Sequence, residues 1–287
     1  MSAKKIVITS DSTTDLNKEL IERYNVDILP LLVTLGDKTY SDGVDIDADF
    51  IYEYVAKTGE LPKTSAVNIP AAEDFFKKYV DEGYAVIHFT ISSDMSSTYQ
   101  NCSIAAADFE DVYVIDTKNL STGGGLLLVA AAEMAANGME AKEIAEKLSG
   151  LAANVDASFV IDSLEYLHKG GRCSAVAAFG ANLLKLKPCI TVKNGKMGVD
   201  KKYRGKYIDV VKDYVAERLV NINDIDLSRV FITHAGCDDE VVNAALEVLK
   251  EKAPFKEIFV TRAGCTVSSH CGKNTLGVLF IRKSPIA

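Results

Sequence analysis

The chain has 287 residues, of which 48% are hydrophobic, and its formal net charge at pH 7 is −8. This length is enough for two ordinary domains, and the acidic excess argues against nucleic-acid binding, because neutralising phosphates requires clustered Lys and Arg. No apolar stretch reaches the roughly 20 residues that span a bilayer, and the N-terminus lacks the apolar core of a signal peptide. We therefore expect a cytoplasmic protein with no stable membrane insertion.

In the first half of the chain, short apolar runs alternate with segments of helical periodicity. Strands are predicted at residues 6–9, 85–91 and 112–116, and helices at 17–24, 49–58, 71–82, 126–137 and 141–151. Such alternation favours a mainly parallel sheet flanked by helices. The sequence therefore predicts an N-terminal α/β domain over residues 1–155.

The regular alternation weakens after Gly150. Strands are predicted at residues 158–162, 230–233 and 257–261, and helices at 206–219 and 238–251. Asn194-Gly195 lies between two strand-like segments, and both residues tolerate the positive φ of a tight hairpin turn. These features predict a second α/β domain over residues 156–287 with a more antiparallel sheet. No long linker separates the halves, so we expect close packing and a ligand site between them.

The six cysteines show no C-x-x-C spacing. Cys265 and Cys271 flank His270, yet no second paired set completes a zinc site. We therefore predict reduced, mostly buried thiols, with no metal and no other cofactor.

A hydroxyl-rich loop from Ser92 to Gln100 follows the predicted strand at 85–91 and leads into a small-residue helix. The first turn of a helix has unpaired backbone N–H groups and the positive end of the macrodipole, so hydroxyls there help to hold a carboxylate or a phosphate. The loop contains no Lys, and the chain has no G-x-x-x-x-G-K-[ST] pattern. The loop is therefore predicted as an anion site that differs from a nucleotide-binding P-loop.

Three further polar segments each have two interpretations. Residues 11–15 (Asp-Ser-Thr-Thr-Asp) form a ligand loop at the end of the first strand or cap the next helix. Thr64-Ser65 supply hydroxyl donors or belong to a plain loop. The segment from Ser121 to Gly125 has three glycines, whose bare backbone could bind a phosphate closely. Alternatively, the glycines allow a helix to pack closely on a strand.

His270 is predicted at a glycine turn just before an apolar run. In a hydrolase, a serine of the Ser92–Gln100 loop would be the nucleophile and His270 its base, although no G-x-S-x-G elbow supports this. Orienting or charge-balancing a carboxylate suits His270 better, because a histidine pKa can lie near neutrality. His88 and His234 are predicted as core or turn residues. A serine/histidine hydrolase or a phosphoryl-transfer enzyme acting on a small acid is the alternative function.

Taken together, these segments resemble the DegV family of fatty-acid-binding proteins along nearly the whole chain. The matching segments occur in the family's order, at residues 11–15, 40–43, 64–65, 92–100, 116–117, 167–172, 187–188, 204–205, 234–236 and 270–272. The resemblance implies the two-domain α/β fold described above, with a long-chain fatty acid held between the domains. It also implies a carrier rather than an enzyme, which presents the carboxylate of the acid to a separate fatty acid kinase subunit.

The resemblance further implies roles for individual residues. Thr64 and Ser96 would hydrogen-bond the carboxylate, with His270 and Arg172 nearby and with secondary candidates Ser65, Ser93, Ser97 and Thr98. Arg204, in the basic cluster at residues 201–206, is similar to the arginine with which the family engages its kinase.

Two segments depart from the family pattern. Ser97 stands where the family usually has Gly, and residues 271–275 (Cys-Gly-Lys-Asn-Thr) stand where it tends to have Thr-Gly-Pro-Gly-Ala. An acyl tail would contribute about 0.8 kcal/mol per buried CH₂ before the costs of binding. The candidates for the wall of its tunnel, each with ordinary core as the alternative, are Phe159, Ile161, Leu164, Leu167, Phe179, Leu183, Leu184, Ile190, Leu276 and Leu279.

Overall fold

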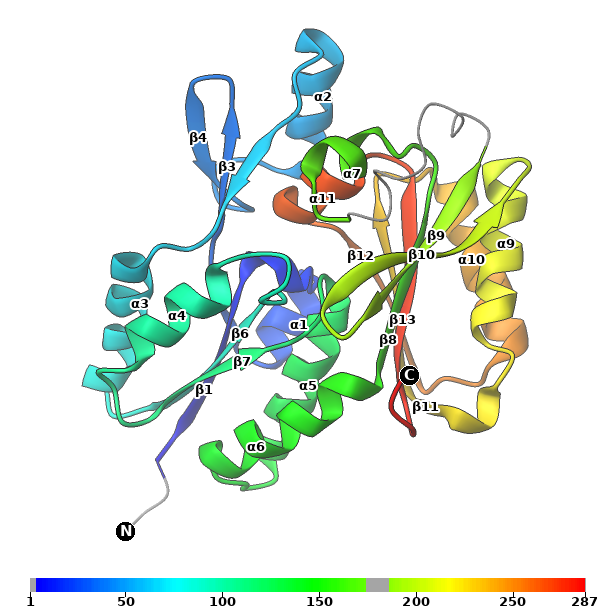
Figure 1. Cartoon of the computed structure of the whole chain (residues 1–287). Helices are drawn as coiled ribbons and strands as arrows, with labels where there is room; N and C mark the ends of the chain where they lie inside the picture. The colour runs from blue at the N-terminus through cyan, green and yellow to red at the C-terminus, as the bar shows by residue number, and fades with distance from the viewer. Residues whose placement is uncertain (1–3, 174–185, 287) are drawn as a thin grey trace.

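Two β-sheets separated by a layer of helices form the body of the protein (Figure 1). The structure, a computed structural model, describes residues 4–173 and 186–286. Helices also cover the outer face of each sheet, so the layers alternate between helix and sheet across the molecule. The predicted fold class, α/β with one parallel and one more antiparallel sheet, is confirmed.

The first sheet is fully parallel, with the strand order β2-β1-β6-β7. Its strands are β1 (Ile6–Asp11), β2 (Asp27–Leu29), β6 (Ala85–Thr90) and β7 (Val112–Asp116). Every residue of β6 is buried, as expected for a parallel strand with helices on both faces. Those helices are α1 (Lys18–Arg23), α3 (Ile69–Asp81), α4 (Thr98–Ala106), α5 (Thr122–Ala136) and α6 (Ala141–Leu151).

A small antiparallel sheet stands above the first sheet in Figure 1 and carries Thr64. It comprises β3 (Leu32–Leu35), β4 (Lys38–Ser41) and β5 (Lys63–Ser65), with α2 (Ala48–Thr58) beside it. Thr64 pairs with Val33 in this sheet, so its segment is a strand rather than the plain loop considered above. A strand of three residues is too short for its alternation to be recognised in the sequence.

The second sheet has the order β10-β9-β8-β13-β11-β12, in which only the β11–β12 pair is parallel. Its strands are β8 (Val155–Ile161), β9 (Lys187–Lys193), β10 (Lys196–Tyr203), β11 (Ile225–Ala235), β12 (Glu257–Arg262) and β13 (Thr275–Arg282). The predicted β9–β10 hairpin is confirmed, because Asn194 and Gly195 both have positive φ. Its accompanying helices are α7 (Glu165–Gly170), α9 (Tyr207–Arg218), α10 (Asp239–Lys252) and α11 (Cys265–Cys271).

The helix layer between the two sheets belongs to a core that both sheets share. Leu126, Leu127 and Leu128 of α5 are fully buried in one cluster with Ile87 of the first sheet and Phe159 of the second. The change from the first sheet to the second occurs between β7 and β8, and the boundary between residues 155 and 156 stays a prediction, one residue into β8. Short 3₁₀ helices complete the described chain at η1 (Ser12–Thr14), η2 (Ala152–Asn154) and η4 (Ile222–Asp224).

The three glycines at 123–125 form the first turn of α5, where they allow close packing. A Cβ on Gly125 would lie 2.8 Å from Leu16 Cδ2 and 3.1 Å from the Thr14 carbonyl oxygen. A Cβ on Gly123 would lie 2.2 Å from Asn119 Oδ1. The packing interpretation of this segment is therefore confirmed, and neighbouring side chains occupy the space that a phosphate would need.

Replacing Gly125 with Ala tests this packing. The added methyl would overpack the contact with Leu16 and Thr14, and we expect a loss of about 1–3 kcal/mol in the free energy of unfolding. The matched control is Gly150→Ala in α6, where a Cβ meets no atom within 4 Å. There we expect a gain of about 0.5–1 kcal/mol from helix propensity. Urea denaturation measures both, and a Gly125→Ala variant as stable as the wild type would contradict the packing argument.

Candidate functional site

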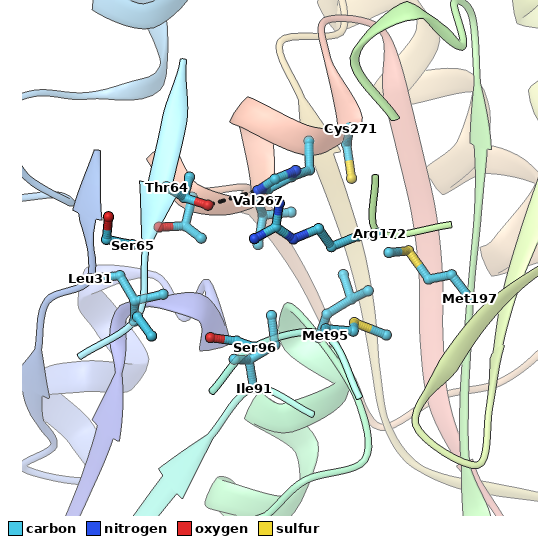
Figure 2. A pocket seen from close by; sticks show the side chains of 14 residues that line it. Leu31, Thr64, Ser65, Ile91, Met95, Ser96, Arg172, Met197, Val267 and Cys271 are labelled. Carbon is cyan, nitrogen blue, oxygen red and sulfur yellow. Dashed lines mark hydrogen bonds between the residues drawn. The ribbon is translucent and has the colours of Figure 1, made fainter. Parts of the chain in front are cut away.

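A cavity opens beyond the carboxyl ends of β2, β6 and β7, where Leu31, Ile91 and Leu120 line it; this is the place where open α/β sheets bind ligands. The space between its atoms amounts to about 520 Å³, with the open mouth and its solvent included. Among the described residues, its polar lining comes from Thr64, Ser65, Ser96, Arg172, Thr266 and His270. Apolar side chains, among them Leu31, Ile91 and Met95, form most of the remaining wall (Figure 2). We call this space the head cavity.

A second cavity adjoins the first, and we call it the tail cavity; the space between its atoms amounts to about 380 Å³, open solvent included. Leu120, Val267 and Cys271 line both spaces, so the two are adjacent. The tail cavity reaches between the sheets to Phe159 of β8 and Gly277 of β13. Its hydroxyls are already paired inside the protein: Ser158 Oγ lies 2.9 Å from Tyr214 Oη, and Thr233 Oγ1 lies 2.8 Å from Thr261 Oγ1. The head cavity therefore offers polar groups, whereas the adjacent tail cavity is effectively apolar.

Ser96 is the residue of the Ser92–Gln100 loop whose hydroxyl faces the head cavity (Figure 2). Its Oγ accepts the backbone N–H of Thr98 at 3.2 Å and lies 2.9 Å from Thr98 Oγ1. A hydroxyl has one proton and two acceptor positions. When Thr98 Oγ1 donates to Ser96, both acceptor positions of Ser96 are filled and its own proton is free to be donated into the cavity.

The other predicted hydroxyls of this loop point elsewhere. Ser93 is exposed and accepts a hydrogen bond from Lys118 Nζ at 2.9 Å. Ser97 is exposed at the start of α4, and the buried Thr98 contacts Ser96 instead of lining the cavity. Ser92 Oγ donates to the Gly195 carbonyl at 2.8 Å, which attaches the loop to the tip of the β9–β10 hairpin.

His270 Nε2 lies 2.8 Å from Thr64 Oγ1, so the head cavity joins side chains from β5 and α11 (dashed line in Figure 2). The imidazole lies in the last turn of α11 instead of a glycine turn. A Cβ on Gly170 would lie 2.4 Å from His270 Nδ1, so this glycine lets α7 pack against the ring. Nδ1 itself has no hydrogen-bond partner among the residues described.

Burial, and to a smaller extent the nearby Arg172, lowers the pKa of His270 to about 4. The imidazole of the unliganded protein is therefore neutral at pH 7, which favours the orienting role considered for His270 over the charge-balancing one. The sequence could not reveal that α7 and β5 enclose its ring. Neutral His270 can orient the Thr64 hydroxyl and, through it, a carboxylate.

Arg172 supplies the positive charge in the wall of the head cavity. Its guanidinium donates from Nη1 to the Gly170 carbonyl at 2.8 Å, and Figure 2 shows the side chain extending toward Val267. A guanidinium has five N–H donors, so this one internal hydrogen bond leaves donors for a carboxylate at the mouth of the cavity.

Three buried carboxylates near the head cavity accept backbone N–H groups from residues in its wall or next to them in the chain. Asp11 accepts from Ile91 at 2.8 Å, and Asp42 accepts from Cys265 at 2.8 Å and from Thr266 at 3.0 Å. Asp15 accepts from Gly264 at 2.8 Å and from the Ser121 hydroxyl. Burial raises the pKa of Asp11 to about 6 and that of Asp15 to about 8. These contacts join distant segments, and local sequence patterns give no signal for them.

The interpretation that residues 11–15 cap the next predicted helix is wrong. Asp11 accepts the Thr13 backbone N–H and so caps η1, whereas Asn17 caps α1. The predicted core role of His88 is confirmed, because the ring is fully buried and its Nδ1 lies 2.9 Å from Thr9 Oγ1. His234 lies at the end of β11 and accepts the Cys237 backbone N–H at 3.2 Å.

Two of the proposed tunnel residues, Phe159 and Leu279, line the tail cavity. Five others are buried but line neither cavity: Ile161, Leu164, Leu167, Ile190 and Leu276. The remaining three, Phe179, Leu183 and Leu184, lie outside the described residues.

Arg204 is exposed between β10 and α9, away from the lining of both cavities. The sequence interpretation missed Thr266 and small wall residues such as Gly277, which no motif distinguishes.

All six cysteines are buried. Within residues 4–173 and 186–286, no His, Cys, Asp and Glu side chains form a group of three that could hold a metal ion. In the same part of the chain, none of the helices combines the length and the apolar character needed to cross a membrane.

Comparisons with known proteins agree on one family. The family model described as "Uncharacterised protein, DegV family" matches residues 5–283. A DegV domain-containing protein of Clostridium acetobutylicum is 34% identical over 284 residues, which cover 98% of this chain and 99% of the relative. The structure of a fatty-acid-binding DegV family protein from Thermus thermophilus matches with a TM-score of 0.87 at 28% identity, over 97% of this chain and 99% of that one. A stearic-acid-binding protein from Eubacterium ventriosum matches with a TM-score of 0.80 at 30% identity, over 96% and 98% of the two chains.

The buried carboxyl group of Asp15 predicts a pH-dependent stability. Its pKa of about 8 in the folded protein exceeds its ordinary value of 3.8, so the folded state retains a proton that the unfolded state loses between these values. Stability therefore falls as pH rises through this range, by up to about 1.4 kcal/mol per pH unit for one group. Asp15→Asn mimics the protonated form, and its free energy of unfolding relative to wild type should increase from pH 5 to pH 8.

Denaturant unfolding at several pH values measures this difference. Asp37→Asn, an exposed site with the same change of charge, serves as the control for net charge. A difference between Asp15→Asn and wild type that stays constant with pH would contradict the assignment.

Proposed function

The chain belongs to the DegV family, and we propose that it binds a long-chain fatty acid in the adjacent head and tail cavities. The observation that carries this proposal is that a cavity lined in part by hydroxyls lies directly beside an apolar one. A fatty acid combines a polar head and an apolar tail in the same way. The relatives from Thermus thermophilus and Eubacterium ventriosum, described as fatty-acid binding and stearic-acid binding, support the same ligand class.

The carboxylate would lie between Thr64 and Ser96, within reach of Arg172. An ionised carboxylate is held best by charge-assisted hydrogen bonds once it leaves water. Ser96 has a free proton when Thr98 donates to it, and Thr64 has one when His270 Nε2–H donates to Thr64 Oγ1. A bound carboxylate therefore selects the Nε2–H tautomer of neutral His270. Ser65, on the same strand as Thr64, is a further donor in the lining.

The acyl tail would pass Leu120, Val267 and Cys271 and enter the tail cavity. Most of the affinity would come from this part, at about 0.8 kcal/mol per buried CH₂ before the costs of binding. Phe159 and Leu279 would contact the distal carbons, and Gly277, the partner of Phe159 in the sheet, adds no side chain to this wall. Internal pairing of Ser158 and Thr233 keeps these walls effectively apolar.

We further propose that the protein acts as a carrier that presents the carboxylate to a separate fatty acid kinase. The head cavity is open at its mouth. The basic cluster at residues 201–206 lies at the end of β10, and its Arg204 is exposed. A hydrolase receives less support, because His270 Nε2 is paired with Thr64 and no described carboxylate orients its Nδ1. The base of a hydrolytic triad needs both a nucleophile and an orienting partner.

The binding proposal is tested by mass spectrometry of lipid extracted from the purified protein and by titration with palmitate or oleate. We expect a bound or bindable long-chain acid. The double variant Thr64→Val, Ser96→Ala should raise the dissociation constant by about 100-fold or more, because two hydrogen bonds to a charged group are lost. Calorimetry or a displacement assay gives the dissociation constants.

The matched control is Ser93→Ala, Ser97→Ala, which removes two hydroxyls of the same loop that lie outside the cavity. We expect this variant to bind the acid with nearly wild-type affinity. Absence of any acyl ligand would refute the function, and equal affinities in the two double variants would remove Thr64 and Ser96 from the head-group contact.

A further inference from the structure

Thr266 has a buried hydroxyl that no group of the protein satisfies. The residue is only 4% exposed, and its Oγ1 has no hydrogen-bond partner among the described residues. A buried hydroxyl without a partner costs free energy, so such groups are rare in folded proteins. Thr266 also lines the head cavity, where a ligand could supply the partner.

The other hydroxyls of α11 provide the contrast. Ser269 Oγ donates to the Cys265 carbonyl at 2.7 Å, and Ser268 Oγ donates to the Ala263 carbonyl at 3.1 Å. Serine and threonine in helices commonly satisfy themselves in this way, with a carbonyl of the preceding turn. Thr266 lies in the first turn of the same short helix, where no preceding helical turn offers a carbonyl, and its hydroxyl has no partner within the described protein.

The position of Thr266 places its side chain at the head-group end. It precedes His270 by four residues, so the two side chains lie on the same face of α11. It lines the head cavity but not the tail cavity, whereas its neighbour Val267 lines both. Its backbone N–H is held by Asp42 Oδ2 at 3.0 Å, which fixes the residue on the cavity wall.

We propose that Thr266 is a third hydroxyl donor to the carboxylate of the bound acid, in addition to Thr64 and Ser96. This inference rests on the proposed function. The ligand's oxygen provides the missing partner, so the hydrogen bond forms only in the complex. The free protein carries the cost of the unpaired hydroxyl, and binding removes it.

Thr266→Val tests the proposal, because valine keeps the shape and removes only the hydroxyl. The dissociation constant for palmitate should rise by about 10- to 100-fold, the effect of one hydrogen bond to a charged group. The unliganded variant should be as stable as the wild type or more stable, because an unpaired buried polar group has been removed. For hexadecanol, which offers a neutral head group, the loss should be smaller. Thr266→Ser retains the hydroxyl and should restore most of the affinity.

Ser269→Ala is the matched control, since it deletes a satisfied hydroxyl from the same helix. It should lower the stability of the free protein and change the dissociation constant by less than about twofold. If wild type binds palmitate and Thr266→Val binds it equally well, water satisfies this hydroxyl and the inference is overturned while the proposed function stands. Equal losses for palmitate and hexadecanol, together with reduced stability, would also overturn it by showing a packing role. Failure of wild type to bind any acid would overturn both.

Discussion

The hydrogen bonds from backbone N–H groups to three buried carboxylates position the walls of the head cavity. Asp11, Asp15 and Asp42 all lie in the first 42 residues, yet two of them accept from residues 264–266 at the start of α11. The connection between the two halves of the chain thus depends on these contacts as well as on the shared apolar core. Because the acceptors are buried, water competes little for the donors, and the cavity walls are held before any ligand arrives. Such preorganisation lowers the entropic cost of binding.

The same carboxylates create an electrostatic problem that the fold resolves. Three acidic groups stand near a site proposed to bind an anion, and no described cation is paired with them. Their oxygens accept hydrogen bonds from N–H and hydroxyl donors. Burial also raises the pKa values of Asp11 and Asp15, which shifts both groups toward the protonated state. With His270 neutral, recognition of a carboxylate would depend on hydroxyls and on Arg172 at the cavity mouth. Affinity would then come mainly from the tail, and the head group would set the orientation.

Local patterns in the sequence were enough to predict the main elements and part of the candidate site. The apolar runs of β1, β6 and β7, the helical periodicity of α3, α6 and α10, and the Asn194-Gly195 turn all appear as predicted, because each arises from neighbouring residues. The ordered family motifs directed attention to Thr64, Ser96 and His270, which the fold brings to one cavity. The antiparallel strands β3 to β5 were missed, because strands of three or four residues carry almost no periodic signal.

Long-range contacts account for what the sequence did not predict. Neutral His270 results from α7 and β5 closing over its ring, and the unpaired hydroxyl of Thr266 results from its place on the cavity wall. Ser93 and Ser97 have the same chemistry and nearly the same sequence position as Ser96, but the loop turns their side chains toward solvent. Residue type and spacing do not specify these orientations. They depend on the hydrogen bonds of the loop to Asp11 and to the β9–β10 hairpin.

The central claim is that one acyl chain occupies both cavities with its carboxylate in the head cavity. A crystal structure of the complex with a fatty acid brominated at its terminal carbon tests this directly. The account predicts an anomalous bromine peak in the tail cavity beside Phe159 and Gly277, with continuous density ending between Thr64 and Ser96. A bromine peak in the head cavity, or an acyl chain bound outside both cavities, would contradict it.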